Sequence, residues 1–586
     1  MAKQIGRRAF VGAAAGTAVA ALLAACGSTA APTPAPAATA APAGGAATKP
    51  AAPAATSAPA AATTAPAAAA TTPPAAAATP AAGAAAATKP AAAAAPAAGK
   101  RGGTFNYAEA GDFNNFNPWN FGAVNFEMYD QVFSRLLWKD GTGKANPDLA
   151  ESWQLAPDNL SIKLKLRDGL KWHDGKPVTA DDFVTMFGYN KDEALAKDPS
   201  VTKIRGLMTP IKDVTAPDKS TVQMTFSAPV PYITDILDYW FLIRIDDKSD
   251  PQFLKKPPIG TGPFKQVEWQ PNQFARYTRN PDYWNKDFPL IDEFLFKRLS
   301  QAETLLPNLK SGAVDGILMT SLSDVAPMQA DKGYTVDVND NAGSIFNMNV
   351  NISKPPLDKK EVRQALSYSL NRVEMAKSAF FGVSKPITST FYSPASLAYR
   401  EDLVMAHPFD LQKARQLLDG AGVKSLDLTL VVTPAWPQMK LFGLVWQQDL
   451  AKINVNLKIN EVENAKFYEI GGAKDLQGND LIAWLNGRTT RDPAIFWSTQ
   501  GNYRGGSTNP YGYKNDDMEK QIAAAAVETD PDKRKKMYQA LNELAISESH
   551  VIAVATNPRI WAYRANITGY KVDLNGNLFL DAVSKG

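Results

Sequence analysis

The sequence is poor in the side chains that most often bind transition metals. Its 586 residues include one cysteine, Cys26, and three histidines, His173, His407 and His550. A single thiol excludes an internal disulfide, and it excludes thiolate zinc and iron–sulfur sites. The three histidines are scattered along the chain and form no cluster, so we expect no metal centre and no cofactor.

Residues 27–100 lack acidic and aromatic side chains altogether. These 74 positions hold 40 alanines and 13 prolines, a composition that cannot build a hydrophobic core. Alanine favours helix, but the frequent prolines interrupt it. We therefore expect a disordered, partly polyproline tether over 26–100.

The net charge of +4 comes from the N-terminal part of the chain. The first 100 residues hold six basic and no acidic side chains, so residues 101–586 carry 56 basic against 58 acidic side chains. This balance gives no electrostatic footprint for a nucleic acid partner. At roughly 100–200 residues per domain, residues 101–586 should hold two to four lobes.

Residues 1–25 have the pattern of a signal peptide. A basic start precedes an apolar run over 11–25, which at about 1.5 Å per residue reaches only ~22 Å of a ~30 Å hydrocarbon core. The Arg7-Arg8 pair, with Phe10 two places on, resembles a twin-arginine signal. An ordinary Sec signal with a basic start is the alternative.

Cys26 follows the apolar run directly. Leu23-Ala24-Ala25-Cys26-Gly27 resembles a bacterial lipobox, which implies that Cys26 is lipidated and becomes the mature N-terminus. Two or more acyl chains give stable anchoring. A buried structural cysteine is the alternative, but the surrounding residues could not bury it. We expect the protein at the extracytoplasmic face of the bacterial cell membrane, or in the periplasm of a host with two membranes.

Hydrophobic periodicity predicts a mixed α/β fold for residues 101–586. Thr179 is a plausible N-cap for a helix with Asp182 at its third position. The expected strands include 104–108, 161–166 and 455–462. The expected helices include 127–137, 181–190, 361–375, 411–418, 439–452, 514–526 and 530–546.

The segments 146–153 and 166–182 carry a recognisable signature. They read Asn-Pro-Asp-Leu-Ala-Glu-Ser-Trp and Leu-Arg-Asp-Gly-Leu-Lys-Trp-His-Asp-Gly-Lys-Pro-Val-Thr-Ala-Asp-Asp. The Asp-Gly pairs favour tight turns. This passage resembles the signature of the family 5 extracellular solute-binding proteins, the peptide, opine and nickel receptors of ABC importers. It implies a type II (cluster C) periplasmic-binding-protein-like α/β fold, with two large lobes around a cleft and an extra subdomain.

Further segments support the resemblance over residues 101–586. They are Gly260–Phe264, Asn280–Trp284, Asn349–Asn351, Pro355–Leu357 and Val362–Leu366. The family has two chain crossings between its lobes, which we place near 340–346 and 555–560. The implied division is lobe I (101–143, 258–343 and 556–586), lobe II, the extra subdomain (144–257), and lobe III (344–555).

The resemblance implies a binding protein rather than an enzyme. We expect a lipid-anchored monomer that captures an oligopeptide or related small solute between two lobes and delivers it to ABC permease subunits. Opine-like conjugates and oligosaccharides remain open as ligands, and nickel is disfavoured because no histidines cluster. The alternative is an extracytoplasmic hydrolase on the same tether, although no Gly-x-Ser-x-Gly motif occurs.

The resemblance places the ligand segment at 483–493. In the peptide receptors this segment holds an aspartate that pairs with the peptide's α-ammonium, and the matching position falls near the neutral Thr489. Arg488 and Arg491 are available instead, and a guanidinium suits a carboxylate, sulfonate or phosphate. We therefore expect an anionic group on the ligand. The alternative is that one arginine pairs internally with Asp492 while the other is solvated.

Aromatic and amide side chains are expected to line the rest of the cleft, because aromatic rings give a large contact area at low rotamer cost. For each aromatic residue, ordinary core packing is the competing interpretation. The expected ligand-binding residues are Phe113, Phe116, Asn117, Trp119, Trp436, Trp484, Asn486, Arg488, Thr489, Arg491, Asp492, Tyr511 and Tyr513.

Three other motifs fail on inspection. Residues 169–177 have the wrong glycine spacing for a phosphate loop, and Pro177 stands where Ser or Thr is needed. Residues 337–348 begin like a calcium loop but have Ala342 and Met348 at the positions that require Gly and Glu. His173 and Asp174 are adjacent, and side chains at i and i+1 rarely converge into a catalytic pair, so we interpret both as structural.

Overall fold

The computed structural model describes residues 99–111, 116–119, 126–198, 200–245, 258–487, 492–505, 509–573 and 576–586. They belong to one of the two units into which the chain divides, Gly83–Gly586. Cys26 and the expected signal peptide and tether, residues 1–98, lie outside the described residues. None of the helices in the described part is long and apolar enough to cross a membrane.

A ten-stranded mixed sheet runs through the described part of the chain. Its spatial order is β14-β13-β15-β12-β16-β11-β1-β10-β9-β8. The strands are β1 (Thr104–Glu109), β8 (Phe264–Gln270), β9 (Phe274–Arg279), β10 (Glu293–Arg298), β11 (Gly316–Leu318), β12 (Tyr334–Val350), β13 (Leu426–Val432), β14 (Val455–Glu461), β15 (Leu481–Asn486) and β16 (Val551–Arg564).

Two groups of parallel strands occupy opposite ends of this sheet. On one side β1 runs parallel to both β10 and β11. On the other side β13 runs parallel to β14 and β15. Parallel strands are normally buried on both faces, and β13 accordingly ends in the buried run Leu430–Val432.

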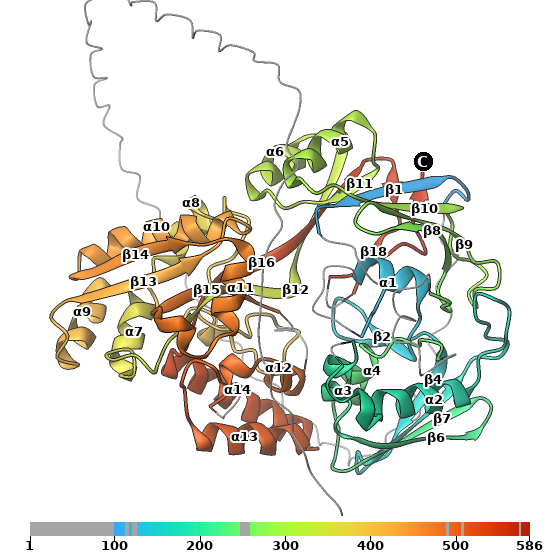
Figure 1. Cartoon of the computed structure of the whole chain (residues 1–586), viewed down its shortest axis with the longest axis horizontal. Coiled ribbons are helices and arrows are strands. Elements are labelled where there is room, and N and C mark those ends of the chain that lie inside the picture. The colour runs from blue at the N-terminus through green and yellow to red at the C-terminus, as the bar shows by residue number, and fades with distance from the viewer. Residues whose placement is uncertain are drawn as a thin grey trace, which may run out of the picture. The chain divides into compact units, whose positions relative to one another are not determined.

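The long strands β12 and β16 connect the two groups (Figure 1). They pair antiparallel from Tyr334 opposite Arg564 to Asn349 opposite Val551, with a register shift between Asn339 and Ser344. One end of the ladder joins the strand group of β1 through β11, and the other joins the group of β13 through β15. The chain therefore passes from one group to the other near residues 339–344 and near Asn557.

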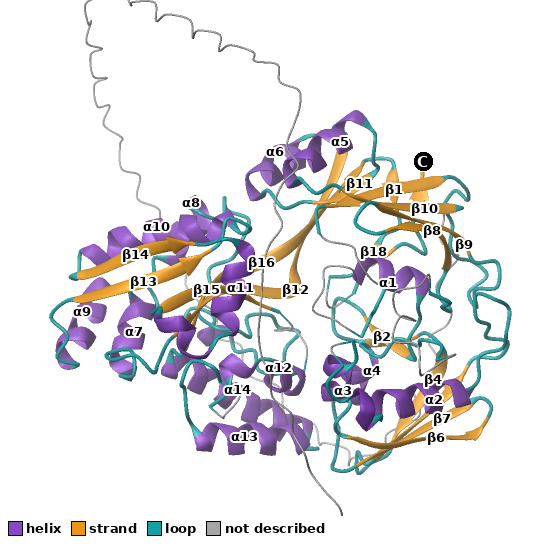
Figure 2. Cartoon of the chain, in the orientation of Figure 1, coloured by secondary structure: helices purple, strands orange, loops and turns teal. Residues whose placement is uncertain are grey.

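Helices cover the β13–β15 side of the sheet, as Figure 2 shows. Helix α10 packs on β13 and β14, and α7 packs on α9. The helices of this side are α7 (Lys360–Tyr368), α8 (Arg372–Ser378), α9 (Leu411–Gly420), α10 (Pro437–Ala451), α11 (Asn464–Gly472), α12 (Pro493–Thr499), α13 (Asp516–Val527) and α14 (Pro531–Glu548). Two further helices flank β11. Helix α5 (Leu305–Ser311) precedes β11, and helix α6 (Val325–Ala330) lies between β11 and β12.

A separate four-stranded antiparallel sheet, in the order β4-β5-β7-β6, forms between the first strand and β8. In β5, residues 162, 164 and 166 are buried while Lys163 and Lys165 are exposed, which confirms the period of two expected for this strand. The elements of this region are β4 (Ala150–Leu155), β5 (Ser161–Leu166), β6 (Ile211–Asp218), β7 (Thr221–Phe226), α2 (Ala180–Lys191), α3 (Thr202–Leu207) and α4 (Ile233–Leu237).

The expected cap of α2 is present. The backbone N–H of Thr179 donates to Asp182 Oδ2 at 2.7 Å. In a capping box, this is the hydrogen bond that the side chain of the third helical residue accepts. The short elements elsewhere are α1 (Phe126–Val132), β2 (Leu137–Lys139), β3 (Ala145–Pro147), β17 (Ile567–Thr568), β18 (Lys571–Val572), β19 (Leu578–Phe579) and β20 (Ser584–Lys585).

Two expected helices differ from those observed. The helix expected over 127–137 ends at Val132, and Leu137 begins β2. The helix expected over 361–375 is interrupted between α7 and α8, where Ser369 Oγ donates to the carbonyl of Leu366 and accepts from Trp446 Nε1. The break coincides with a side chain that is bonded to a partner far along the chain. The hydrophobic periodicity of α7 and α8 does not reveal that bond.

Candidate functional site

The carboxyl ends of the two parallel groups point toward the same part of the molecule. β15 ends at Asn486, which pairs with Ile345 of β12, and each earlier residue of β15 pairs further along β12. β11 ends at Leu318 opposite Trp561, and Trp561 pairs with Asp337 of β12. Both strands therefore run toward the crossing at 339–344 from opposite sides. In open α/β sheets, ligands bind outside the carboxyl ends of the strands.

Asn486 stands at this edge with unused hydrogen-bonding capacity. Its side chain is 1% exposed, and Nδ2 donates to Asn347 Oδ1 at 2.7 Å and to the Tyr503 hydroxyl at 3.4 Å. Its Oδ1 has no hydrogen-bond partner among the described residues. A buried carbonyl left without a donor costs about 1–3 kcal/mol, so an N–H donor would be favoured at this position.

The amide of Asn486 belongs to a chain of buried polar groups. Asn347 Nδ2 donates to Asn349 Oδ1 at 3.1 Å, and Asn349 Nδ2 lies 3.5 Å from the Tyr511 hydroxyl. Tyr511 in turn donates to the carbonyl of Gly471 at 2.6 Å. The two asparagines of β12 are two residues apart and so share one face of the strand. Both lie in the part of β12 that pairs with β15.

Tyr511 and Tyr513 are packed inside the protein. Burial raises the pKa of each hydroxyl to about 12. The ring of Tyr513 stacks on His550 at 3.9 Å between ring centres, and its hydroxyl accepts from Asn515 Nδ2 at 3.1 Å. Both tyrosines therefore pack in the core in this structure, which is the interpretation that competes with ligand contact.

Trp484 and Trp436 are half-buried. Trp484 on β15 stacks on Phe467 with ring centres 5.3 Å apart. A Cβ at Gly471 would come within 2.2 Å of the Trp484 ring, so only glycine allows this approach. Trp436 is the residue that precedes α10, directly after β13, and it packs against the core at the carboxyl end of that strand.

The residues expected after the first strand are mostly buried. Trp119 donates its Nε1–H to the carbonyl of Phe241 at 3.2 Å, and Phe116 makes an edge contact with Trp269. Asn117 Nδ2 donates to the carbonyl of Ser200 at 2.7 Å. These contacts tie the loop to neighbouring segments. Phe113 lies outside the described residues.

Of the ligand segment, the structure describes the two ends. Arg488, Thr489 and Arg491 lie outside the described residues. Asp492 caps α12 by accepting the N–H of Ala494 at 2.9 Å, and its two carboxylate oxygens accept from Arg534 at 2.6 and 2.7 Å. Arg534 was not identified from the sequence as a partner because it stands 42 residues further along the chain.

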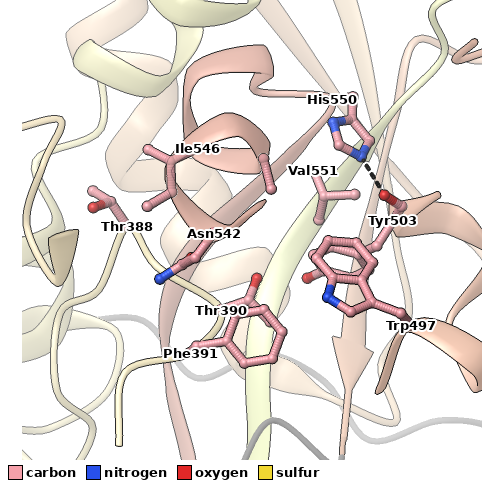
Figure 3. A pocket seen from close by; sticks show the side chains of 10 residues that line it. Thr388, Thr390, Phe391, Trp497, Tyr503, Asn542, Ile546, His550 and Val551 are labelled. Atoms are coloured by element: carbon pink, nitrogen blue, oxygen red, sulfur yellow. Dashed lines mark hydrogen bonds between the residues drawn. The ribbon is translucent and has the colours of Figure 1, made fainter. Parts of the chain in front are cut away.

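A small enclosed cavity lies near the same strand end, at residues that sequence reasoning missed. Figure 3 shows Thr390, Asn542 and Trp497 around it, and its free space is about 10 Å³, enough for one water molecule. Trp497 Nε1 has no hydrogen-bond partner among the described residues. This space is too small for a peptide-sized solute, and its lining mixes polar, aromatic and aliphatic residues that no sequence motif singles out.

His173 is a structural residue. Its Nδ1 accepts the N–H of Gly260 at 3.2 Å, so Nε2 carries the proton and donates to the carbonyl of Gly262 at 3.1 Å. Burial lowers the pKa of His173 to about 4. Asp174 pairs instead with Arg244 at 2.6 Å. Among the described residues, no group of three or more His, Cys, Asp or Glu side chains is placed to hold a metal ion.

Two groups of parallel strands that end at a shared double crossing are features of periplasmic binding proteins, which hold a solute between lobes, and the fold is of their type II class. The chain belongs to the bacterial extracellular solute-binding proteins, family 5, whose model matches residues 144–509. This family consists of solute receptors rather than enzymes. The expected fold class and family are therefore confirmed.

Known relatives and solved structures match more than four fifths of this chain. The dipeptide-binding protein of Escherichia coli K12 is 27% identical over 518 residues, which is 82% of this chain and 94% of the relative. A dipeptide-binding protein from Pseudoalteromonas sp. SM9913, solved with Met-Leu, superposes with a TM-score of 0.71 at 22% identity, covering 83% of this chain and 100% of the other. The binding protein AgaA from A. tumefaciens R10, solved with agropinic acid, gives a TM-score of 0.69 at 22% identity, covering 83% and 99%.

Proposed function

We propose that this protein is a lipid-anchored receptor that captures an oligopeptide or a related small solute with an anionic group and delivers it to ABC permease subunits. The observation that carries the proposal is the register of β11, β12, β15 and β16, which directs the strand ends of both groups to one crossing. A solute bound there would touch both groups, so it would shift the open–closed equilibrium through its contacts with both.

The proposed lobes follow the boundaries expected from the sequence. Lobe I comprises 101–143, 258–343 and 556–586, lobe II comprises 144–257, and lobe III comprises 344–555. The register shift between Asn339 and Ser344 supports a crossing at the first of these boundaries. The solute-facing residues would come from the strand ends, with Asn486 and Trp484 on β15 and Trp436 after β13.

The proposed anchor is Cys26, and the proposed tether is the alanine- and proline-rich segment that follows. The support is the Leu-Ala-Ala-Cys-Gly sequence directly after a short apolar run. Dual or triple acylation provides stable membrane attachment where a single chain would be marginal. The receptor would then work at the outer face of the cell membrane, within reach of its permease.

Mass spectrometry of the full-length protein extracted from membranes tests both parts of this proposal. Native mass spectra are expected to show a bound solute that is released on denaturation, because solute held between two lobes dissociates slowly. The denatured chain is expected to begin at Cys26 and to carry the mass of a diacylglyceryl group. An unmodified N-terminus would refute the anchor alone. Absence of any retained solute, together with no binding to a panel of peptides, opines and oligosaccharides, would refute the receptor role.

Arg488→Ala and Arg491→Ala are expected to weaken the binding of anionic solutes by roughly 10- to 100-fold, because a charge-assisted hydrogen bond to a carboxylate is worth about 1.5–3 kcal/mol. Isothermal titration with Met-Leu, agropinic acid and a neutral oligosaccharide measures the effect. Arg276→Ala is the matched control, since Arg276 is half-exposed on β9 and pairs weakly with Glu268 at 3.6 Å. Unchanged affinity for each solute in both variants contradicts the assignment.

A further inference from the structure

Asp492 is rigidly held at the point where the ligand segment enters α12. Both carboxylate oxygens accept from Arg534 of α14, and Arg534 Nε donates to the carbonyl of Ala525 at 3.2 Å. Arg534 is 4% exposed and lies against Tyr538, with 5.0 Å between its guanidinium carbon and the ring centre. These bonds lie within proposed lobe III, so they fix the start of α12 relative to α14.

The same two residues also contact proposed lobe II. The backbone N–H of Asp492 donates to Asp235 Oδ1 at 3.3 Å, and Asp235 is 2% exposed and ion-paired with Lys139. The guanidinium of Arg534 lies 5.6 Å from the centre of the Tyr232 ring. Tyr232 and Asp235 stand at the start of α4, so one turn of lobe II receives both contacts.

Apolar packing continues this contact. Ile495 of α12 is fully buried in the hydrophobic cluster that contains the core residues of the four-stranded-sheet region, although the chain around it belongs to proposed lobe III. Tyr232 packs against that cluster and also against the cluster of α12, α13 and α14. Helix α12 lies against α3 of the same region. The contact therefore combines one ion-pair network with one buried aliphatic side chain.

We propose that lobe II is a docking platform for the α12–α14 part of lobe III, and that this docking holds the receptor closed. We define the docking contact as Tyr232 and Asp235 on lobe II with Asp492, Ile495 and Arg534 on lobe III. The contact is small, since it consists of one hydrogen bond, one cation–π contact and one buried aliphatic side chain. It can therefore break without unfolding either lobe, as a reversible latch requires.

The latch would couple docking to solute capture. The ligand segment of proposed lobe III ends at Asp492, so a solute that contacts this segment would also favour the docked position of Asp492, and docking would favour binding in return. This coupling depends on the proposed function. The docking itself does not, because it rests on direct contacts between two parts of the chain.

The distance between the two lobes tests the latch in protein that has been freed of retained solute by unfolding and refolding. Cys26→Ser removes the only cysteine of the full chain, after which Lys219→Cys and Lys536→Cys, both at exposed positions, accept spin labels in lobes II and III. Double electron–electron resonance then reports the closed and open populations. In the Tyr232→Ala and Asp235→Ala backgrounds the closed-to-open ratio is expected to fall about three- to tenfold, because the lost contacts favour only the docked state.

Tyr232→Phe is the matched control, since it keeps the ring face beneath Arg534 and is expected to retain the parent ratio. Tyr232→Leu, which keeps apolar bulk without a π face, decides the question if Tyr232→Ala does not fold. Parent-like distance distributions in both Asp235→Ala and a folded Tyr232 variant without the ring would overturn the proposal. Since no solute is added, this outcome is distinguishable from a failure of the proposed receptor function.

Discussion

Arg135→Met is expected to lower the free energy of unfolding at pH 7 by about 3–5 kcal/mol, because it leaves buried carboxylates without their counter-charge. The Arg135 guanidinium is ion-paired with Asp130, lies 2.8 Å from Asp238 Oδ1, and is 3.9 Å from Asp573 Oδ2. All four side chains are almost completely buried. Urea unfolding followed by tryptophan fluorescence measures the loss.

The electrostatics of this cluster make the effect depend on pH. Burial alone would lower the pKa of Arg135, but the neighbouring carboxylates outweigh it and raise that pKa. Burial raises the pKa of Asp130 well above its usual value even with Arg135 present. A carboxyl group with a raised folded-state pKa destabilises the folded state at high pH, where the group is ionised. This destabilisation disappears as the group is protonated at lower pH. Burial raises the pKa of Asp148 to about 6, and the charge of Arg135 lowers that pKa in the parent. The difference between Arg135→Met and the parent should therefore shrink from pH 7 to pH 5.

Arg276→Met provides the control for Arg135→Met, because it removes the same functional group from an exposed position. Exposed ion pairs contribute about 0–1 kcal/mol, so this variant should unfold close to the parent. A loss below about 1 kcal/mol for Arg135→Met, or a loss that grows at pH 5, would contradict the assigned role of the cluster.

The parts of the fold that sequence patterns predict well are those where one local rule decides the structure. β5 alternates Ile, Lys, Leu, Lys and Leu, and only a strand with one buried face satisfies that pattern. Thr179 and Asp182 identify the start of α2 because a short-range hydrogen bond caps it. In each case the deciding interaction spans a few residues.

The parts that escape prediction depend on partners far along the chain. The break between α7 and α8 depends on Ser369 and Trp446, which are 77 residues apart. A local signal was available at its far side, where Asn371 caps α8 by accepting the N–H of Glu374 at 3.1 Å. The pattern Asn-x-x-Glu is typical of a helix start, and it would have divided the expected helix.

The candidate site shows the same limit. The resemblance to the family placed the ligand segment near β15, but it could not reveal that Asn486 would face Asn347 of β12 or that Asp492 would be held by Arg534. Residue type alone also gave no means to separate core aromatics from cleft aromatics. Tyr511 and Tyr513 carry the same sequence signal as Trp436, yet the Tyr511 hydroxyl donates to the Gly471 carbonyl and the Tyr513 ring stacks on His550.

Lowering the pH from 7 to 5 is expected to destabilise the fold through its buried histidines. Burial lowers the pKa of His550 to about 3 and that of His407 to about 4. In the unfolded chain both titrate near a pKa of about 6.5. The unfolded state therefore binds more protons as the pH falls from about 6.5 toward 4, and stability is lost over that window. Each histidine should account for about 2 kcal/mol between pH 7 and pH 5.

The contacts of His550 explain why it stays neutral in the folded state. Its Nε2 donates to the carbonyl of Tyr503 at 3.0 Å, its ring stacks on Tyr513, and the positive charge of Arg363 disfavours protonation further. Nδ1 has no hydrogen-bond partner in the part of the chain that the structure describes, so a proton added there would carry a buried charge without a partner.

His550→Gln isolates this contribution, because the glutamine amide can still donate to the Tyr503 carbonyl but does not titrate. Burial raises the pKa values of Asp130 and Asp148. As the pH falls, protonation of these two carboxyl groups stabilises the folded parent and partly offsets the destabilisation caused by the histidines. The comparison is therefore made between proteins: the loss of unfolding free energy from pH 7 to pH 5 should be about 2 kcal/mol smaller in His550→Gln than in the parent. Equal pH dependence in the two proteins would show that His550 is not the group that is protonated on unfolding.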